Sequence, residues 1–462
     1  MDTNPPTSTC PDCVLLRAEV AALTAKLQEL ERKLNRNSSN SSKPPSSDPP
    51  WQRPPPASPT GRKPGGQRGH PGHFRVPLQP TSVQLYIPQH CAACGLALPQ
   101  TAAPSDPQPI RHQVLELPEQ PLAIVEHQSH ARTCPGCGHC TRQPLPADIT
   151  ASVVGPRLAG ALSWWVAKGH VARRFVVEIL ETVFKVPLSL GTVVACEAEV
   201  SAALAQPYAV IAAAVRAASS ANLDETSWRC FRERPWVWVV ATTRSVLYGI
   251  RPTRSAQEVK ALLGNLLQAR IVGSDRFGAY NGLPLECRQL CWAHLIRDFV
   301  RIGELADGAA LSQVCLDTAK AVFTQWYAFR DGRLTRVQLQ AQIQPLRDAL
   351  FAQMQAHHRG SPNPQVRNFA GRIERPFAAL WTFVEHEGVE PTNNEAERML
   401  RTMVQWRKNS YGCHSTGGCQ FAERIMSVLQ TLRKQGRDVL SYLAAAIQAH
   451  RTATPPPAII PA

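Results

Sequence analysis

The stretch from Trp236 to Ile250 reads WVWVVA-TTRS-VLYGI, two apolar runs separated by four polar residues. Valine and aromatic residues favour strands, and two such runs on either side of a short polar connection are typical of a strand pair. Residues 255–267 have helical spacing, and residues 270–273 and 288–292 predict two more short strands. The second of these runs into a further helix. This order of strands and helices predicts a mixed α/β domain, which we assign to residues 216–450.

Three acidic residues lie at the ends of predicted elements of this domain. Asp224 follows an apolar run, Asp275 ends another, and Glu397 lies near the start of a predicted helix. Loops at strand ends are where such sheets place their functional groups. Carboxylates from separate elements can meet in one cleft and hold two divalent ions about 3.5–4 Å apart. The sequence therefore predicts that Asp224, Asp275 and Glu397 bind Mg²⁺ or Mn²⁺, an arrangement suited to phosphoryl transfer.

The predicted helix around Glu397 carries two acids and several basic residues. Glu395 and Glu397 point about 200° apart on a helix, so only one of them can face the ions, and we expect Glu397 to do so. Asn393 or Asn394 suits the N-cap of this helix. Basic residues can contact phosphate oxygens. The residues that we expect to contact DNA phosphates are Arg62, Lys63, Arg68, Arg398, Arg401, Arg407 and Lys408.

The composition indicates a multidomain α+β protein with a polyanionic partner. The chain has 462 residues, enough for three or more domains, and a formal net charge of +15. Its start is polar, and no uncharged apolar run approaches the length of a membrane span. We therefore expect a cytoplasmic protein without membrane association. In a reducing compartment, its fourteen cysteines favour metal thiolates over a disulfide framework.

The first 35 residues predict a coiled-coil segment. Leucine and valine recur every seven residues in two interleaved series, which gives an a/d seam. The seam consists of Leu16, Val20, Leu23, Leu27, Leu30 and Leu34. About three heptads are marginal as an isolated helix, so we expect a homo-oligomer; the alternative is a short amphipathic helix packed on its own domain. Residues 36–80, rich in Pro, Ser and Gly and basic, predict an extended or disordered linker.

Residues 81–147 contain two Cys-x-x-Cys pairs and predict a zinc-binding module. The four thiolates that we expect to bind one structural Zn²⁺ are those of Cys91, Cys94, Cys134 and Cys137. Gly95 and Gly136 suit the tight turns, and strands over 82–87 and 124–130 could bring the pairs together. His139 and Cys140 are spare candidates for this site. Cys10 and Cys13 have no second pair nearby, so we interpret them as exposed thiols or as a metal site across a dimer.

Two further segments have helical patterns. Residues 148–215 predict short helices that resemble a helix-turn-helix unit, although helical packing without DNA contact fits the pattern equally well. Residues 302–389 predict a helical insertion in the α/β domain. Residues 451–462 are interpreted as a tail.

Several of these segments, taken in order, resemble one family. The zipper, the Asn/Ser/Pro linker and Gly-Arg-Lys-Pro-Gly-Gly-Gln at 61–67 precede the paired Cys-x-x-Cys motifs. Asp-Glu-Thr at 224–226, Cys-Trp-Ala-His-Leu-Ile-Arg-Asp-Phe at 291–299 and Asn-Asn-x-Ala-Glu-Arg at 393–398 follow. Together they are similar to the transposases of the insertion sequence 66 family, over essentially the whole chain.

The resemblance implies an RNase H-like catalytic domain, an Asp-Asp-Glu metal triad, and cleavage of element ends followed by strand transfer into target DNA. It assigns the triad to Asp224, Asp275 and Glu397, and implies a bacterial, nucleoid-associated protein. Accessory proteins encoded by the element are candidate partners, and the sequence does not decide whether they are needed. His294 is a candidate for contact with the scissile phosphate, with Arg297 beside it; a helix-start role is the alternative for His294. Thr392 stands where the family often has Asp, and residues 276–280 match the family only loosely. Catalytic competence therefore stays open, and the alternatives are an inactive DNA-binding protein that occupies element ends and a nuclease without strand joining.

Overall fold

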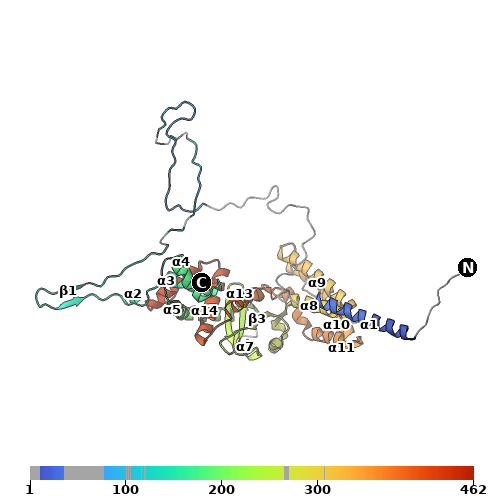
Figure 1. Cartoon of the computed structure of the whole chain (residues 1–462). Coiled ribbons are helices and arrows are strands. Elements are labelled where there is room, and N and C mark those ends of the chain that lie inside the picture. Colours follow the sequence, from blue (N-terminus) through green and yellow to red (C-terminus); the bar gives the residue numbers. More distant parts are fainter. Residues whose placement is uncertain are drawn as a thin grey trace. The chain divides into compact units, whose positions relative to one another are not determined.

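The computed structural model describes residues 11–35, 77–99, 101, 103–104, 106–115, 117–118, 121–264, 270–305 and 307–461. Its contacts divide the chain into two compact units, residues 53–125 and residues 1–52 together with 126–462 (Figure 1). Most of the predicted linker lies outside the described residues. The same is true of Cys10, Arg62, Lys63 and Arg68.

The N-terminal segment forms a single helix, α1, over Pro11–Leu34. The residues of the predicted seam are exposed along this helix, each by at least 58% of its surface. Such a stripe of exposed aliphatic side chains is the feature that pairing with another helix would bury. The helix itself was predicted from the sequence, and its pairing stays a prediction.

A short hairpin precedes the main domain. Strands β1 (Ala131–Thr133) and β2 (Cys140–Arg142) pair antiparallel, with Ala131 opposite Arg142. The prediction of strands over 82–87 and 124–130 was wrong, because both segments lie outside any strand. Nearly all their side chains are exposed, so neither segment has an apolar face buried against a neighbour.

A five-stranded sheet forms the centre of the main domain, with strand order β5-β4-β3-β6-β7. The strands are β3 (Ser220–Ser227), β4 (Trp236–Ala241), β5 (Val246–Arg251), β6 (Ile271–Ser274) and β7 (Arg288–Leu290). The first three are antiparallel neighbours, whereas β6 is parallel to β3 and β7 is parallel to β6. The predicted strand pair over 236–250 and the mixed α/β character are both confirmed.

The connection from β5 to β6 contains a helix that is shorter than predicted. Helix α7 spans Ala256–Leu263 and is followed by Gly264 with a φ of +74°. A left-handed residue ends an α-helix, and glycine adopts that conformation most readily. The remainder of the predicted helix, residues 265–267, lies outside the described residues.

The helices that precede the sheet along the chain and those that follow it share one hydrophobic core with the sheet. Those before the sheet are α3 (Pro156–Ala167), α4 (Arg173–Thr182), α5 (Leu190–Ala203) and α6 (Ala205–Ala217). The short helix α2 (Ala147–Thr150) precedes them and buries none of its residues. Those after the sheet are α13 (Asn394–Ser410), α14 (Thr416–Lys434) and α15 (Val439–Arg451). Helix α3 packs on α5 and α15, and α14 packs on β5. The helical segment over 156–217 is thus built into the same body as the sheet.

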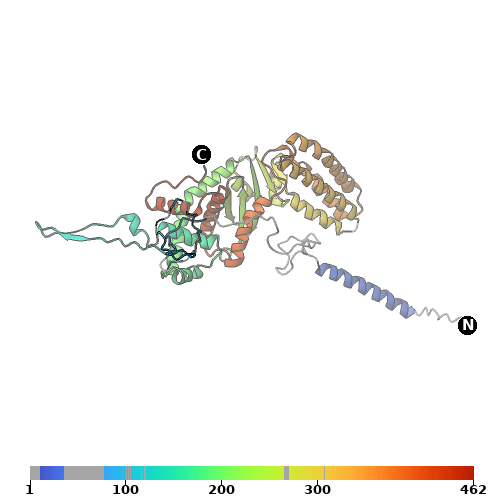
Figure 2. The ribbon, with the colours of Figure 1, turned by 90° about the horizontal axis from the view of Figure 1, so that it is seen from above.

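A second core lies under the helices between β7 and α13. These helices are α8 (Trp292–Gly303), α9 (Ala309–Arg330), α10 (Arg336–Gly360), α11 (Pro364–Glu374) and α12 (Thr382–Glu385). Ile271 and Leu290 belong to this core, so the helices attach to the β6–β7 side of the sheet. Figure 2 shows them in yellow and orange, side by side beside the sheet.

Trp292, at the first position of α8, anchors these helices. Its side chain is fully buried, its Nε1 donates to the carbonyl of Leu380 at 2.8 Å, and its ring packs edge-on against Trp381 at 5.1 Å. Trp292 is therefore a core residue of these helices.

Among the described residues, no single helix is long and apolar enough to cross a membrane. The bent pair α5–α6 passes that test on length and composition alone, and residues of both helices belong to the core that surrounds the sheet.

Candidate active site

Asp224 and Asp275 lie level with each other on adjacent strands. The parallel register pairs Asn222 on β3 with Gly273 on β6, and each aspartate is two residues further along. Side chains two residues apart lie on the same face of a sheet, and neighbouring strands are about 4.8 Å apart. The Oδ1 of Asp275 accepts the backbone N–H of Phe277 at 2.9 Å, which fixes the carboxylate just beyond the end of β6.

Glu397 reaches the same region from the first turn of α13, a helix that packs on β3 and β4. Asn393 is the N-cap residue of this helix, but its side chain makes no capping bond to the helix. Its Nδ2 instead donates to the carbonyl of Leu223 at 2.9 Å. Asn393 therefore occupies the expected N-cap position. Its side chain does not cap the helix and instead ties the start of α13 to β3, one residue before Asp224.

The three acids influence one another electrostatically. Burial raises the pKa of Asp224 well above its ordinary value, and the charges of Glu225, Asp275 and Glu397 raise it further. Several carboxylates that repel one another in a partly buried site form the arrangement that a bound cation relieves.

Glu225, for which we predicted no role, holds the segment after Asp275 in place. Its side chain is buried and accepts hydrogen bonds from Arg254, at 2.6 Å from Nε, and from the hydroxyl of Tyr280. The guanidinium of Arg254 also lies 3.5 Å from the centre of the Phe277 ring. These contacts attach β3 to residues 277–280 and thereby hold the backbone on which Asp275 sits.

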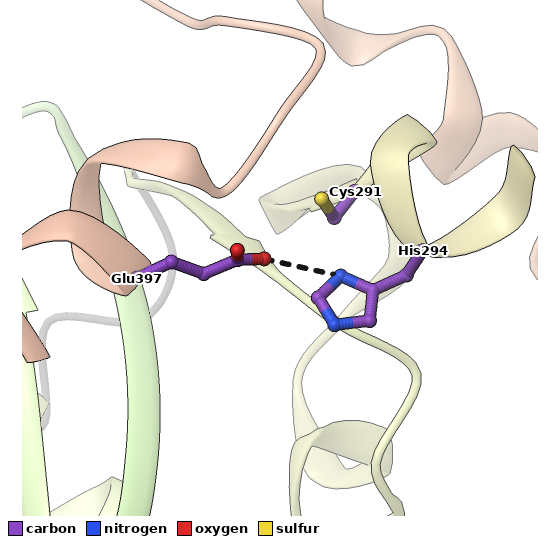
Figure 3. A group of neighbouring side chains, drawn as sticks. All are labelled: Cys291, His294 and Glu397. Atoms are coloured by element: carbon purple, nitrogen blue, oxygen red, sulfur yellow. Dashed lines mark ion pairs between the residues drawn. The ribbon is translucent and has the colours of Figure 1, made fainter. Parts of the chain in front are cut away.

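His294 and Cys291 lie beside Glu397. The Nδ1 of His294 is 3.5 Å from Oε1 of Glu397, and a dashed line joins the two side chains in Figure 3. Burial, followed by the charge of Arg297, lowers the pKa of the His294 ring. The sequence did not single out Cys291 as a ligand, although the Cys-x-x-His spacing of residues 291–294 is a metal-ligand spacing and could have identified it.

The carboxylate of Glu395 contacts different residues from the carboxylate of Glu397. Its carboxylate forms ion pairs with Lys434 at 2.5 Å and with Arg398 at 2.6 Å. This geometry agrees with the expectation that the two acids of the helix face different directions.

The predicted DNA-contacting residues of α13 differ in their surroundings. Arg398, Arg401 and Lys408 are exposed. Arg407 is partly buried, and its guanidinium donates to Ser227 and, at 3.3 Å, to the hydroxyl of Thr226. Arg407 therefore supports the end of β3 and has less freedom than the others to contact a phosphate.

The two Cys-x-x-Cys pairs have the same backbone geometry. In each, the first cysteine donates its N–H to the carbonyl five residues later, and the glycine four residues later donates back to it. These glycines are Gly95 and Gly138, with φ of +76° and +70°. Gly136 lies in the turn of the second pair, as expected, and Gly138 closes that turn.

Backbone N–H groups also point at the first sulfur of each pair. They lower the pKa of Cys91, chiefly through Ala93 and Cys94, and that of Cys134, chiefly through Cys137 and Gly136. Such donors stabilise a thiolate, the form that binds zinc. Each pair is thus a half-site, and because the pairs lie in different compact units, the four-cysteine site stays a prediction.

The donor atoms fit the expected ions. Asp224, Asp275 and Glu397 offer only oxygen ligands, which Mg²⁺ and Mn²⁺ prefer. Within the described residues, Oε1 of Glu397 is buried without a hydrogen-bond partner, as expected of an atom that awaits a cation. The cysteine pairs offer only sulfur, which suits zinc.

Comparison with known families gives two matches. The model of the family described as Transposase IS66 family matches residues 152–421, more than half of the chain. A family of unknown function, DUF6444, matches residues 8–76. No curated protein matches the chain.

Proposed function

The chain belongs to the IS66 family of transposases, and from this premise we propose that it cuts the ends of an insertion element and joins them to target DNA. A transposase is a nucleic-acid-processing enzyme that binds DNA. The observation that carries the finer proposal is the convergence of Asp224, Asp275 and Glu397, which come from β3, the end of β6 and α13 and whose charges act on one another.

In this proposal each acid has a defined task. Asp224 and Asp275 hold divalent ions from the sheet, and Glu397 completes the ligand set from the helix. When bound, the ions supply Lewis-acid chemistry at the scissile phosphate and make water a better nucleophile. The 3′-hydroxyl released by the cut then attacks a phosphate of the target DNA by the same in-line displacement. The bracing of residues 277–280 by Glu225 and Arg254 keeps Asp275 in position during both steps.

The sheet supports an RNase H-like domain. Three antiparallel strands are followed by two parallel ones, and both aspartates lie where β3 and β6 run side by side. Each aspartate lies two residues past the last β3–β6 pair, Asn222 with Gly273. Active sites of sheets with parallel strands form at the carboxyl ends of those strands. The helices α8 to α12 are then the insertion between the second and third acid.

DNA binding in the proposal rests on basic side chains. The net charge of +15 attracts a polyanion, and Arg398, Arg401 and Lys408 are exposed on the helix that carries Glu397. Their position on α13 lets them hold the phosphates that flank the cut. Helices α3 to α6 are the proposed second DNA-binding surface.

The test is a strand-resolved assay with purified protein, DNA of the element's ends, target DNA and Mg²⁺. We expect cuts at the element ends, joined products in the target, and neither when EDTA removes the ions. A protein that only occupied element ends would bind this DNA and leave both strands intact, and a simple nuclease would cut without joining.

Oligomerisation through α1 gives a first prediction. Leu23→Pro should break the helix, because proline inside a helix costs about 3 kcal/mol. Sedimentation of the 1–40 peptide should show dimers or larger species for the original sequence and monomers for the variant. Glu19→Ala, which lies outside the seam, is the control and should still associate. A monomeric original peptide at high concentration would contradict pairing through this helix alone.

The zinc module gives a second prediction. If the four thiolates bind one ion, Cys134→Ser should lower the zinc content by about one ion per chain, because a tetrahedral site needs its full ligand set. Elemental analysis of the purified protein measures this. Cys140→Ser, on the adjacent strand β2, should keep the ion. An unchanged zinc content in Cys134→Ser would remove the proposed site.

A further inference from the structure

A second group of metal-ligating side chains adjoins the proposed catalytic acids. Among the described residues, ligand atoms of Cys291, His294 and Glu397 all lie within 4.8 Å of one another. Figure 3 shows the thiol, the imidazole and the carboxylate directed toward a common space between α8 and α13. Cys291 directly precedes α8 and His294 lies in its first turn, so the two residues present their side chains on one side of the helix start.

The spacing of the nitrogen and oxygen atoms suits an ion between them. His294 Nδ1 and Glu397 Oε1 are 3.5 Å apart, longer than the usual 2.7–3.2 Å of a hydrogen bond. A tetrahedral zinc ion with bonds of about 2.0–2.2 Å separates its ligand atoms by about 3.3–3.6 Å. Both atoms are buried, and neither has a hydrogen-bond partner in the described part of the chain. Two facing, unsatisfied polar atoms are an arrangement that proteins normally avoid unless something else binds them.

The sulfur of Cys291 is buried and has a backbone hydrogen-bond donor. Cys291 is 2% exposed, and its Sγ accepts the backbone N–H of Asn393 at 3.1 Å. A backbone donor to sulfur is a common outer contact of metal-bound cysteine. The N–H of Trp292 also donates to the carbonyl of Pro391 at 2.9 Å. These bonds join the two segments that carry the ligands, so the site is held together before any ion binds.

We propose that Cys291 Sγ, His294 Nδ1 and a carboxylate oxygen of Glu397 form a binding site for a thiophilic divalent ion such as Zn²⁺. Sulfur and imidazole ligands select zinc and cobalt over Mg²⁺, whose preferred ligands are oxygens. Three protein ligands leave a fourth position for water or a phosphate oxygen. This site is separate from the four cysteines of residues 91–137.

Glu397 belongs to both ligand sets, so zinc and the catalytic ions compete for its carboxylate. A zinc ion on Cys291 and His294 holds the Glu397 carboxylate and withdraws it from the ions of Asp224 and Asp275. Zinc therefore inhibits Mg²⁺-dependent cutting. This consequence rests on the proposed function, whereas zinc binding by the three side chains does not.

Cobalt titration of the full chain tests the binding. Co²⁺ substitutes for zinc and gives a thiolate-to-metal absorption band. The difference between the spectrum of the original protein and that of a variant therefore gives the absorption of the one site that the variant lacks. We expect Cys291→Ser and His294→Ala each to lose the absorption of about one cobalt ion per chain, and added Zn²⁺ to bleach it in the original protein. Cys315→Ser, which removes a buried thiol of α9, is the matched control and should keep the full band. Unchanged bands in both Cys291→Ser and His294→Ala would overturn the proposal.

The inhibition is tested by the ratio of cutting rates with and without Zn²⁺ at constant Mg²⁺. We expect zinc to slow the original protein at least tenfold, and to slow Cys291→Ser by a clearly smaller factor. Equal factors for the two proteins would overturn the regulatory role. If no DNA is cut under any condition, the proposed function fails, and the cobalt spectra still decide whether the site binds a metal.

Discussion

Asp224→Asn, Asp275→Asn and Glu397→Gln are each expected to lower Mg²⁺-dependent cutting by about a hundredfold or more. Each substitution keeps the size of the side chain and removes the charge that holds the ions. Bound ions contribute several kcal/mol to stabilisation of the transition state, and about 1.4 kcal/mol corresponds to a factor of ten in rate. The measurement is the initial rate of cutting of element-end DNA at saturating protein.

The three variants should still fold and bind DNA. Asp224→Asn removes one of several buried like charges, so the metal-free variant should unfold at no lower temperature than the original protein. DNA binding should change little, because it depends on basic side chains that contact phosphates. Normal cutting by all three variants would contradict the Asp-Asp-Glu assignment and leave an unidentified set of residues responsible.

Glu395→Gln is the matched control for Glu397→Gln on the same helix turn. The Glu395 carboxylate is engaged by Lys434 and Arg398, away from the proposed ions. The variant should therefore retain most of the cutting activity. An inactive Glu395→Gln together with an active Glu397→Gln would identify Glu395 as the third acid.

Trp292→Ala is expected to lower the free energy of unfolding by about 3–5 kcal/mol. The substitution leaves a cavity beside Trp381 and removes one of two buried donors to the Leu380 carbonyl, the other being Nε2 of Gln289. Denaturant unfolding followed by circular dichroism measures the loss. The helices α8 to α12 should loosen first, since Trp292 belongs to their core.

Trp292→Phe separates the two contributions. The phenyl ring fills most of the space, so the loss should be smaller and should reflect mainly the missing hydrogen bond. That bond contributes about 0.5–1.5 kcal/mol, because Gln289 still donates to the Leu380 carbonyl. If Trp292→Ala unfolds at the same denaturant concentration as the original protein, Trp292 does not anchor these helices.

Local sequence patterns predicted the elements that depend on local chemistry. The apolar runs at 236–241 and 246–250 became β4 and β5, because valine and aromatic side chains fit a buried sheet. The exposed runs at 82–87 and 124–130 have similar residues but find no surface to cover, so strand propensity there had no effect. Propensity indicated which segments can form strands, and burial decided which of them do.

The placement of the candidate site depended on contacts that sequence spacing does not contain. Asp224 and Asp275 are level only because β3 and β6 pair in parallel in one register. The hydrogen bonds that Asn393 donates to Leu223 and Tyr280 donates to Glu225 join segments far apart in the chain, so no local pattern predicts them. Cys291 is an exception, because its spacing from His294 was visible in the sequence and only the nearness of Glu397 was not.

The most direct test of the central claim is to locate the ions. Crystals of the protein with element-end DNA, soaked in Mn²⁺ and measured near the manganese absorption edge, reveal bound ions by their anomalous scattering. Ions are expected about 2.0–2.3 Å from oxygens of Asp224, Asp275 and Glu397, and about 3.5–4 Å from each other if two are bound. Manganese sites that contact none of these three carboxylates, in crystals where the DNA is bound, would contradict the central claim.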